Sequence, residues 1–375
     1  MSAKKLIVDA SEDTIQNAPP GNMQRKEQRT LPAFLILLIF SCCLLAVLIV
    51  AICFGSTYIP LSTIVQILLN STGLFHFARQ WDPTTELIIW QLRMPDVIGA
   101  ALVGIALSVA GVLFQGMLRN ALADPFLIGT SSGAALGATI AFALPFATIS
   151  GSFFPLTPCL AFIGAMLAVL LVYSIARTDG QVPVMTLLLA GIAVNAILVA
   201  CQTLILALLP QAQFEFQSLF SWLAGGIAVT GWFPIAIVGL IVCIGVICAQ
   251  MLSGVLDAFV LGEEMASYLG LHVERYKLLI TIIGSLLTAA AVSISGLIGF
   301  VGLVIPHAMR LLLGPRHRLL LPASGLAGAI FLTLADLLAR VLIAPAVLPV
   351  GIFTALVGAP FFLFLLRGTK RTYRW

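Results

Sequence analysis

The sequence predicts an all-α polytopic membrane protein with about ten transmembrane helices. Of its 375 residues, 61% are hydrophobic and only 9% are charged, whereas soluble domains carry about 25% charged residues. Apolar runs recur along the chain at about the 20 residues that a helix needs to cross a bilayer. The alternating ten-residue segments of an outer-membrane barrel are absent from the sequence. These observations exclude a soluble enzyme.

The chain begins with a polar segment, residues 1–30, which carries a basic cluster at positions 25–29. A signal peptide would place its apolar core much earlier, so we expect a disordered cytoplasmic tail here. The first apolar run extends from Leu31 to Phe54 and shows no small-residue cleavage pattern. It is long enough to span a membrane.

Nine further spans follow. We expect them near 95–118, 125–146, 158–177, 183–209, 230–251, 275–294, 297–313, 319–343 and 350–367. The stretches 57–92, 210–229 and 344–349 are expected to lie at the membrane interface or to re-enter the membrane in part. Residues 31–367 are thus expected to form one ten-helix domain, followed by a basic cytoplasmic tail, 368–375.

The distribution of basic residues tests this topology, because cytoplasmic loops are enriched in Lys and Arg. With the N-terminus in the cytoplasm, 16 of the 19 basic residues fall on the inner side. Only Arg79, Arg93 and Arg340 fall on the outer side. Both termini are therefore predicted to be cytoplasmic. The net charge of +4 then reflects membrane orientation, and nucleic-acid binding has no support.

The sequence predicts neither a metal site nor a cofactor. The seven cysteines lie in or beside apolar runs, without CxxC spacing and without a nearby histidine. They are interpreted as buried small hydrophobic residues. The four histidines are scattered along the chain.

The spans also lack the groups that drive transport. Secondary transporters usually carry ions or protons on mid-membrane carboxylates or histidines. Here Asp336 is the deepest candidate, and Arg340 lies one turn further along the same expected helix, where it neutralises the carboxylate. None of the five lysines follows a glycine, so the chain has no Walker A loop. It also has no Ser-His-Asp or HExxH arrangement, so we predict a transporter whose energy comes from another polypeptide.

One cytoplasmic segment, Leu261–Gly270, predicts a short helix between two glycines, Gly262 and Gly270. Glu263 and Glu264 lie at its N-terminal end, where the helix dipole favours negative charge. Gly270 suits a C-terminal cap.

Leu261, Met265 and Leu269 follow one another at intervals of four residues, which gives this helix a single apolar stripe. Such a helix either packs on its own transmembrane bundle or docks into a groove of a cytosolic partner. The residues alone favour neither alternative.

An ordered series of motifs resembles the FecCD family, the permease subunits of ATP-binding cassette (ABC) importers for iron–siderophores, haem and cobalamin. The matching pieces are Gln91–Pro95, Gly116–Pro125, Gly129–Ala135, Leu261–Gly270, Ser295–His307, Asp336–Arg340, Leu348–Gly351 and Gly358–Pro360. The resemblance covers about residues 31–367 in unbroken order. Two positions depart from the family pattern: Asp96 replaces an arginine, and Ala121 replaces a proline.

The resemblance implies a type II ABC importer permease fold in the bacterial plasma (inner) membrane. The expected partners are a second permease subunit, the same or homologous, cytosolic ABC ATPase subunits and an extracytoplasmic substrate-binding protein. The chain itself would not be an enzyme, because ATP hydrolysis belongs to the partner. The expected substrate is an iron–siderophore or a related metal chelate. The alternatives are a secondary transporter without an ATPase partner and a membrane-embedded structural or enzymatic subunit.

The resemblance also implies roles for individual residues. Within a coupling segment at about 255–272, the ATPase-coupling residues are Gly262, Glu263, Glu264, Met265, Leu269 and Gly270. Asn120 and Leu122 are expected at the cytoplasmic gate, where an ordinary Asn turn is the alternative. The loop 180–185 is expected to oppose them.

Arg93 and Arg340 are expected to dock acidic residues of the binding protein. The alternative is local pairing of Arg93 with Asp96 or Glu86, and of Arg340 with Asp336.

Overall fold

The computed structural model describes residues 32–55, 57–71, 79, 81–144, 156–208, 216–227, 229, 231–344 and 346–369, with side chains up to 364. The expected tail 1–30 and most of the expected tail 368–375 lie outside these residues. All regular elements of the described part are helices, apart from one isolated bridge between Thr178 and Gln181. The prediction of an all-helical fold is confirmed.

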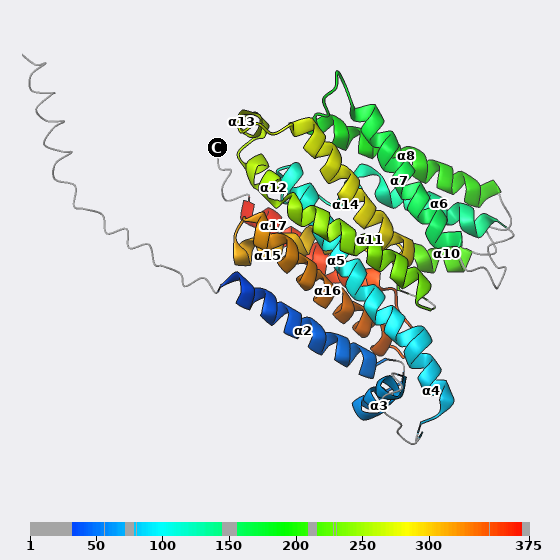
Figure 1. Cartoon of the computed structure of the whole chain (residues 1–375). Coiled ribbons are helices and arrows are strands. Elements are labelled where there is room, and N and C mark those ends of the chain that lie inside the picture. Colours follow the sequence, from blue (N-terminus) through cyan, green and yellow to red (C-terminus); the bar gives the residue numbers. More distant parts are fainter. Residues whose placement is uncertain are drawn as a thin grey trace, which may run out of the picture. The chain divides into compact units, whose positions relative to one another are not determined.

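Seventeen helical elements follow one another along the described chain (Figure 1). They are α2 (Ala33–Cys53), α3 (Leu61–Ser71), α4 (Pro83–Leu87), the π-helical turn η1 (Ile88–Arg93), α5 (Met94–Met117), the 3₁₀ turn η2 (Pro125–Ile128), α6 (Thr130–Ala143), α7 (Leu156–Ala176), α8 (Val184–Leu208), α10 (Phe216–Leu223), α11 (Phe233–Met251), α12 (Ser253–Val260), α13 (Glu263–Tyr268), α14 (Val273–Ser295), α15 (Val301–Leu313), α16 (His317–Val341) and α17 (Val350–Thr369).

Each of the ten predicted spans contains one of these helices. Seven helices are long and apolar enough to cross a membrane: α2, the continuous α4–η1–α5 helix, α7, α8, α11, α14 and α16. At a rise of 1.5 Å per residue, α6 with 14 residues and α15 with 13 are shorter than the hydrocarbon core of about 30 Å. If these two helices cross the membrane, as the sequence predicts, irregular backbone must complete the crossings.

Two predicted boundaries are wrong. The span expected at 95–118 begins earlier, because the helix runs without a break from Pro83 to Met117. Pro95 has no N–H to bond the carbonyl of Gln91, and that carbonyl instead accepts the N–H of Gly231 at 3.1 Å. The span expected at 297–313 begins as a helix only at Val301, because Phe300 has a φ of 69°.

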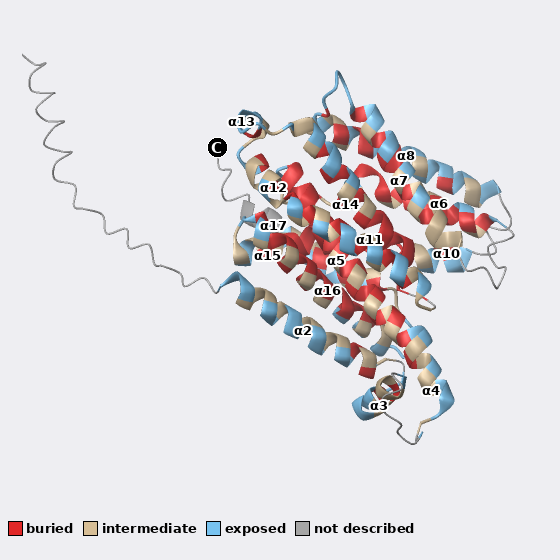
Figure 2. Ribbon diagram, viewed as in Figure 1, coloured by how far each residue is buried: buried red, intermediate tan, exposed pale blue. Residues whose placement is uncertain are grey.

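The helices α5, α14 and α16 form the buried centre, whereas few residues of α2 are buried (Figure 2). The pair α5 and α16 has the most extensive contact. A side chain at Gly104 would collide with the carbonyl of Gly328, so the two backbones touch directly there. Small residues allow this approach where lipid offers no hydrophobic drive for helix association.

The two ends of the bundle carry different segments. At one end, named the α13 end, α5, α7 and α11 finish and α8, α14 and α16 begin. At the other, named the α3 end, α2 and α14 finish and α11 and α17 begin. Figure 1 shows α13 at one end, with α3 and α4 at the other.

Candidate functional site

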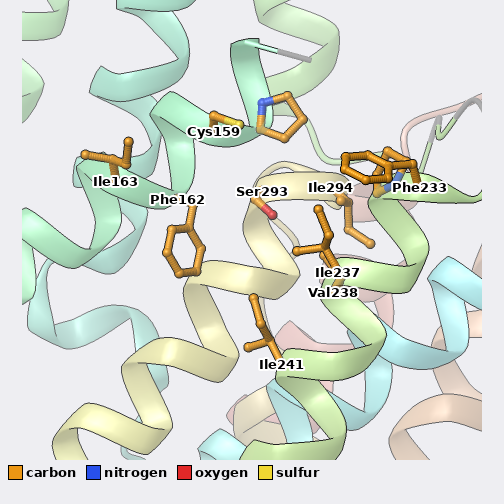
Figure 3. A pocket seen from close by; sticks show the side chains of 11 residues that line it. Cys159, Phe162, Ile163, Phe233, Ile237, Val238, Ile241, Ser293 and Ile294 are labelled. Atoms are coloured by element: carbon orange, nitrogen blue, oxygen red, sulfur yellow. The ribbon is translucent and has the colours of Figure 1, made fainter. Parts of the chain in front are cut away.

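An apolar pocket of about 240 Å³ lies between α7 and α11, over the last turn of α14 (Figure 3). Phe162 and Ile241 line it, and so does the hydroxyl-bearing Ser293. The Ser293 hydroxyl donates to the carbonyl of Ala290 in its own helix, so it offers no free donor. No acidic or basic side chain lines this pocket. Its chemistry suits hydrocarbon and does not provide for recognition of a charged molecule.

At the α13 end, the glycines that bracket α13 fix its length. Gly262 precedes the helix with a φ of 110°, and Gly270 follows it with a φ of 83°. The Gly270 N–H bonds the carbonyl of Ser267 at 2.9 Å, and the Leu271 N–H bonds the carbonyl of Ala266 at 3.1 Å. These two bonds form a Schellman motif. The expected cap at Gly270 is confirmed.

The expected apolar stripe of α13 faces away from the bundle. Ala266 is fully buried and seats the helix. Leu261, Met265 and Leu269 are 63%, 52% and 62% exposed, and Tyr268 is 85% exposed. The stripe therefore does not pack on this chain's own bundle. Tyr268 belongs to the same exposed surface, which was not predicted from the sequence. It lies three residues after Met265, and this helical spacing was the signal for it.

The two glutamates at the start of α13 differ. Glu264 is exposed. Glu263 is held within the chain: its carboxylate lies 2.6 Å from the ammonium of Lys277 and 3.9 Å from the guanidinium of Arg119. Glu263 thus fixes α13 to α14 and to the turn after α5.

The segment before α13 is anchored separately. The Asp257 carboxylate, on α12, accepts the backbone N–H of His317 at 3.0 Å and lies 2.7 Å from Nδ1 of the same residue. His317 begins α16, and its side chain is 1% exposed. Two carboxylates therefore attach the coupling segment to two different spans.

The turn after α5 holds the expected gate residues. Arg119 has a φ of 49°. The side-chain oxygen of Asn120 accepts the N–H of Leu122 at 2.9 Å, which is an Asx turn. Asp124 then caps η2 by accepting the Phe126 N–H at 2.8 Å. Burial raises the pKa of Asp124 to about 6, although this hydrogen bond lowers it in part.

At the α3 end, the structure places Arg93 inside the bundle, where it is 5% exposed. Its guanidinium donates to the carbonyls of Ile52, Cys53 and Thr57 at 3.0, 3.3 and 2.7 Å. It pairs neither with Asp96 nor with Glu86. Arg93 ties the end of α2 to the helix that continues into α5.

Arg340 forms the expected local pair. Its guanidinium lies 2.6 Å from the Asp336 carboxylate, and the two side chains are 11% and 3% exposed. Asp96 accepts the N–H of Val229 at 2.9 Å, so the residue that departs from the family pattern has a structural partner of its own. No binding protein is present, so docking through Arg93 and Arg340 stays a prediction.

Sequence reasoning missed Lys277, Glu274, Val182, Asp257 and His317. Glu274 and Lys277 are three residues apart, which is a helical pairing distance. The position of Lys277 four residues inside an apolar span was a second signal, because such a charge requires a partner.

The chain was compared with known proteins. A profile of the FecCD transport family matches residues 43–368. Over 284 residues the chain is 41% identical to the cobalamin import system permease protein of Halobacterium salinarum, covering 76% of this chain and 74% of that protein. Over 302 residues it is 37% identical to the hemin transport system permease protein of Yersinia pestis, covering 77% and 87%.

A third relative aligns over most of the chain. The iron(3+)-hydroxamate import system permease protein of Bacillus subtilis is 36% identical over 349 residues, covering 92% of this chain and 85% of that protein. A solved structure described as an inward-facing metal-chelate type ABC transporter matches with a TM-score of 0.73 and 28% identity. The match covers 89% of this chain and 99% of that one.

Proposed function

The chain belongs to the FecCD transport family and is a permease subunit of an ABC importer, and from this premise we propose that it moves an iron–siderophore or a related metal chelate into the cytoplasm. Alternating access driven by cytosolic ATPase subunits powers the movement, and an extracytoplasmic binding protein delivers the chelate. A second permease subunit, the same or homologous, completes the path. Because these relatives are permeases of ABC importers, we set aside the alternative of a secondary transporter.

The exposed surface of α13 carries this proposal. Met265, Tyr268 and Leu269 form an apolar patch on a capped helix that projects from one end of the bundle. Exposed apolar patches mark protein–protein contacts. The patch suits a groove of the ATPase, with Glu264 as a charged neighbour. The α13 end is then the cytoplasmic end of a protein in the bacterial inner membrane, with both termini on that side.

Truncating the patch should release the ATPase. We expect the double variant Met265→Ala with Leu269→Ala to bind the ATPase about tenfold more weakly or worse, because losing a buried apolar anchor costs about 1–2 kcal/mol. Co-purification of the ATPase and ATP-dependent uptake of radiolabelled iron–hydroxamate, hemin or cobalamin by proteoliposomes measure this.

The matched control is Leu312→Ala, a truncation of another strongly exposed side chain, which is 71% exposed on α15. It should leave ATPase binding unchanged. If the double variant co-purifies with the ATPase as well as the wild-type protein does, α13 is not the ATPase contact.

Asn120 and Leu122 are proposed to close the cytoplasmic gate against the loop 180–185. Both residues lie on a turn at the α13 end, beside the link between Arg119 and Glu263. If the two permease copies meet at this turn, the Leu122→Cys variants of both copies should crosslink in one nucleotide state and not in another. Crosslinking that is independent of nucleotide would leave Asn120 as an ordinary Asx turn.

We propose only the chemical class of the transported chelate. The relatives' names specify cobalamin, hemin and iron(3+)-hydroxamate, which share a bulky organic ligand around a metal. Titration of the cognate binding protein with these three chelates identifies the substrate.

A further inference from the structure

The ammonium of Lys277 lies one turn inside α14, with its side chain 5% exposed. It reaches a Glu263 oxygen at 2.6 Å, a Glu274 oxygen at 3.0 Å and the carbonyl of Val182 at 3.2 Å. The ammonium donates hydrogen bonds to Val182 and Glu274 and forms an ion pair with Glu263. A buried ammonium requires such partners, because burial of an unpaired charge is costly.

The partners of Lys277 come from different segments. Glu263 begins α13, and Glu274 lies in the first turn of α14. Val182 follows the hairpin turn at Thr178–Gln181 and leads into α8. The second oxygen of Glu274 accepts the Val182 N–H at 2.9 Å, so Val182 is held by both of its backbone polar groups.

Arg119 completes this charge network from the turn after α5. The network of Arg119, Glu263, Glu274 and Lys277 has two positive and two negative charges and is neutral. Among the described residues, the ion pairs of Glu263 are the side-chain charge contacts that attach α13 to other elements. A displacement of α13 by about 1.5 Å along the line between the two groups would take the Glu263 carboxylate and the Lys277 ammonium beyond the ion-pair limit of about 4 Å. A moving α13 must therefore either carry Lys277 and its loop with it or break a buried ion pair.

We propose that Lys277 is a positioning residue that transmits movement of α13 to the 177–183 loop and, through it, to the start of α8. This inference rests on the proposed function, because α13 moves only if the ATPase binds it. ATP binding displaces α13, Glu263 pulls on Lys277, and Lys277 and Glu274 shift the backbone of Val182. The network is the mechanical connection between the ATPase contact and the gate side of the bundle.

The test uses the full permease–ATPase complex with two cysteine reporters in a background without native cysteines. Ser267→Cys reports on α13, and Gln181→Cys reports on the loop; both positions are exposed in the chain alone. The rate of reaction with a maleimide is measured at each position, with and without the ATPase and with and without a non-hydrolysable ATP analogue.

The Ser267→Cys reporter tests the proposed function separately. If the ATPase fails to protect it, α13 is not the ATPase contact and the proposed function fails at this point. If the ATPase protects Ser267→Cys in wild type and in Lys277→Met alike, the complex assembles in both proteins. The Gln181→Cys reporter then tests the role of Lys277.

In wild type we expect the ATP analogue to change the rate at Gln181→Cys. In Lys277→Met the ratio of rates with and without analogue should fall to about 1, which means no coupling. An equal nucleotide response in both proteins, or no response in wild type, overturns the proposal. Loss of folding would instead reduce the reactivity difference at both reporters and abolish ATPase protection.

A second variant keeps the buried ammonium paired. Glu263→Ala removes the link to α13 but leaves Lys277 with Glu274 and Val182, so the loop stays held. It should uncouple the Gln181→Cys reporter as fully as Lys277→Met does, and the double variant should add nothing further. The control Arg275→Gln removes one positive charge from an exposed position two residues away and should keep the wild-type response. If this control also loses the nucleotide response, the loss in Lys277→Met is caused by the change in net charge, and the positioning role of Lys277 is overturned.

Discussion

At the scale of single residues, Arg93 shows that a charge predicted for docking is also a structural element of the fold. The topology rule depletes arginine on the outer side, so its presence there indicated a local reason. The structure supplies that reason as three backbone carbonyls at the end of α2 and in the following loop. The carbonyls of Ile52 and Cys53 lie in the last turn of α2, where they have no N–H partner within the helix, although the Cys53 carbonyl also accepts the N–H of Ile59 at 3.0 Å. The guanidinium satisfies them together.

We therefore expect Arg93→Gln to lower the free energy of unfolding by about 3 kcal/mol, because buried carbonyls lose a charged donor. Denaturant unfolding in detergent micelles measures this. The control is Arg79→Gln, whose guanidinium is 68% exposed and 3.7 Å from Glu86. An exposed pair contributes less than about 1 kcal/mol. Equal stability of the two variants would contradict the structural role and leave docking as the better explanation.

At the scale of elements, α15 contains a proline that the bundle has accommodated. Pro306 lacks the N–H that would bond the carbonyl of Gly302 four residues earlier. Gln115 of α5, which is 1% exposed, places its amide nitrogen 3.5 Å from that carbonyl and 3.1 Å from the carbonyl of Leu303. A side chain from one span thus completes the backbone hydrogen bonding of another.

This arrangement predicts a coupled pair of substitutions. Gln115→Leu should cost about 1–2 kcal/mol of unfolding free energy in the wild-type background, because the carbonyl of Gly302 then lacks a donor. In a Pro306→Ala background the restored N–H supplies that donor, so the same substitution should cost less. Denaturant unfolding of the four proteins gives the cycle. An equal cost in both backgrounds would show that Gln115 acts through packing alone.

Also at this scale, α13 shows what sequence reasoning could and could not reach. The glycines and the stripe of Met265 and Leu269 predicted a short capped helix, because capping and periodicity are local properties. Its outward direction could not be predicted, since it depends on the burial of Ala266 against other elements. The pairing of Glu263 with Lys277 crosses 14 residues, and that of Lys277 with Val182 crosses 95. No local pattern encodes such contacts.

At the scale of the whole molecule, the positions and order of the apolar helices could be predicted because apolar length is a property of each segment alone. Which spans face lipid and which line the translocation path could not be predicted from the sequence. Both α2 and α8 leave most of their surface exposed in the chain, yet they differ in chemistry. Asn195 of α8 is hydrogen-bonded to Ser132 of α6, and Thr203, eight residues further along α8, is exposed. The exposed side chains of α2 are apolar apart from Ser41 and two cysteines.

Asn195 and Thr203 place an amide and a hydroxyl within α8, and polar groups in the hydrocarbon region are costly and mark transport pathways. We therefore predict that α8 lines the translocation path beside the second permease subunit and that α2 faces lipid. In proteoliposomes containing a cysteine-free background, Asn195→Cys and Thr203→Cys should react with a membrane-impermeant thiol reagent added on both sides. Leu45→Cys on α2, at a side chain that is 60% exposed in the chain, should stay unreactive because hydrocarbon excludes the reagent. Reaction at Leu45→Cys as fast as at the two α8 positions would place water along α2 and reverse the assignment.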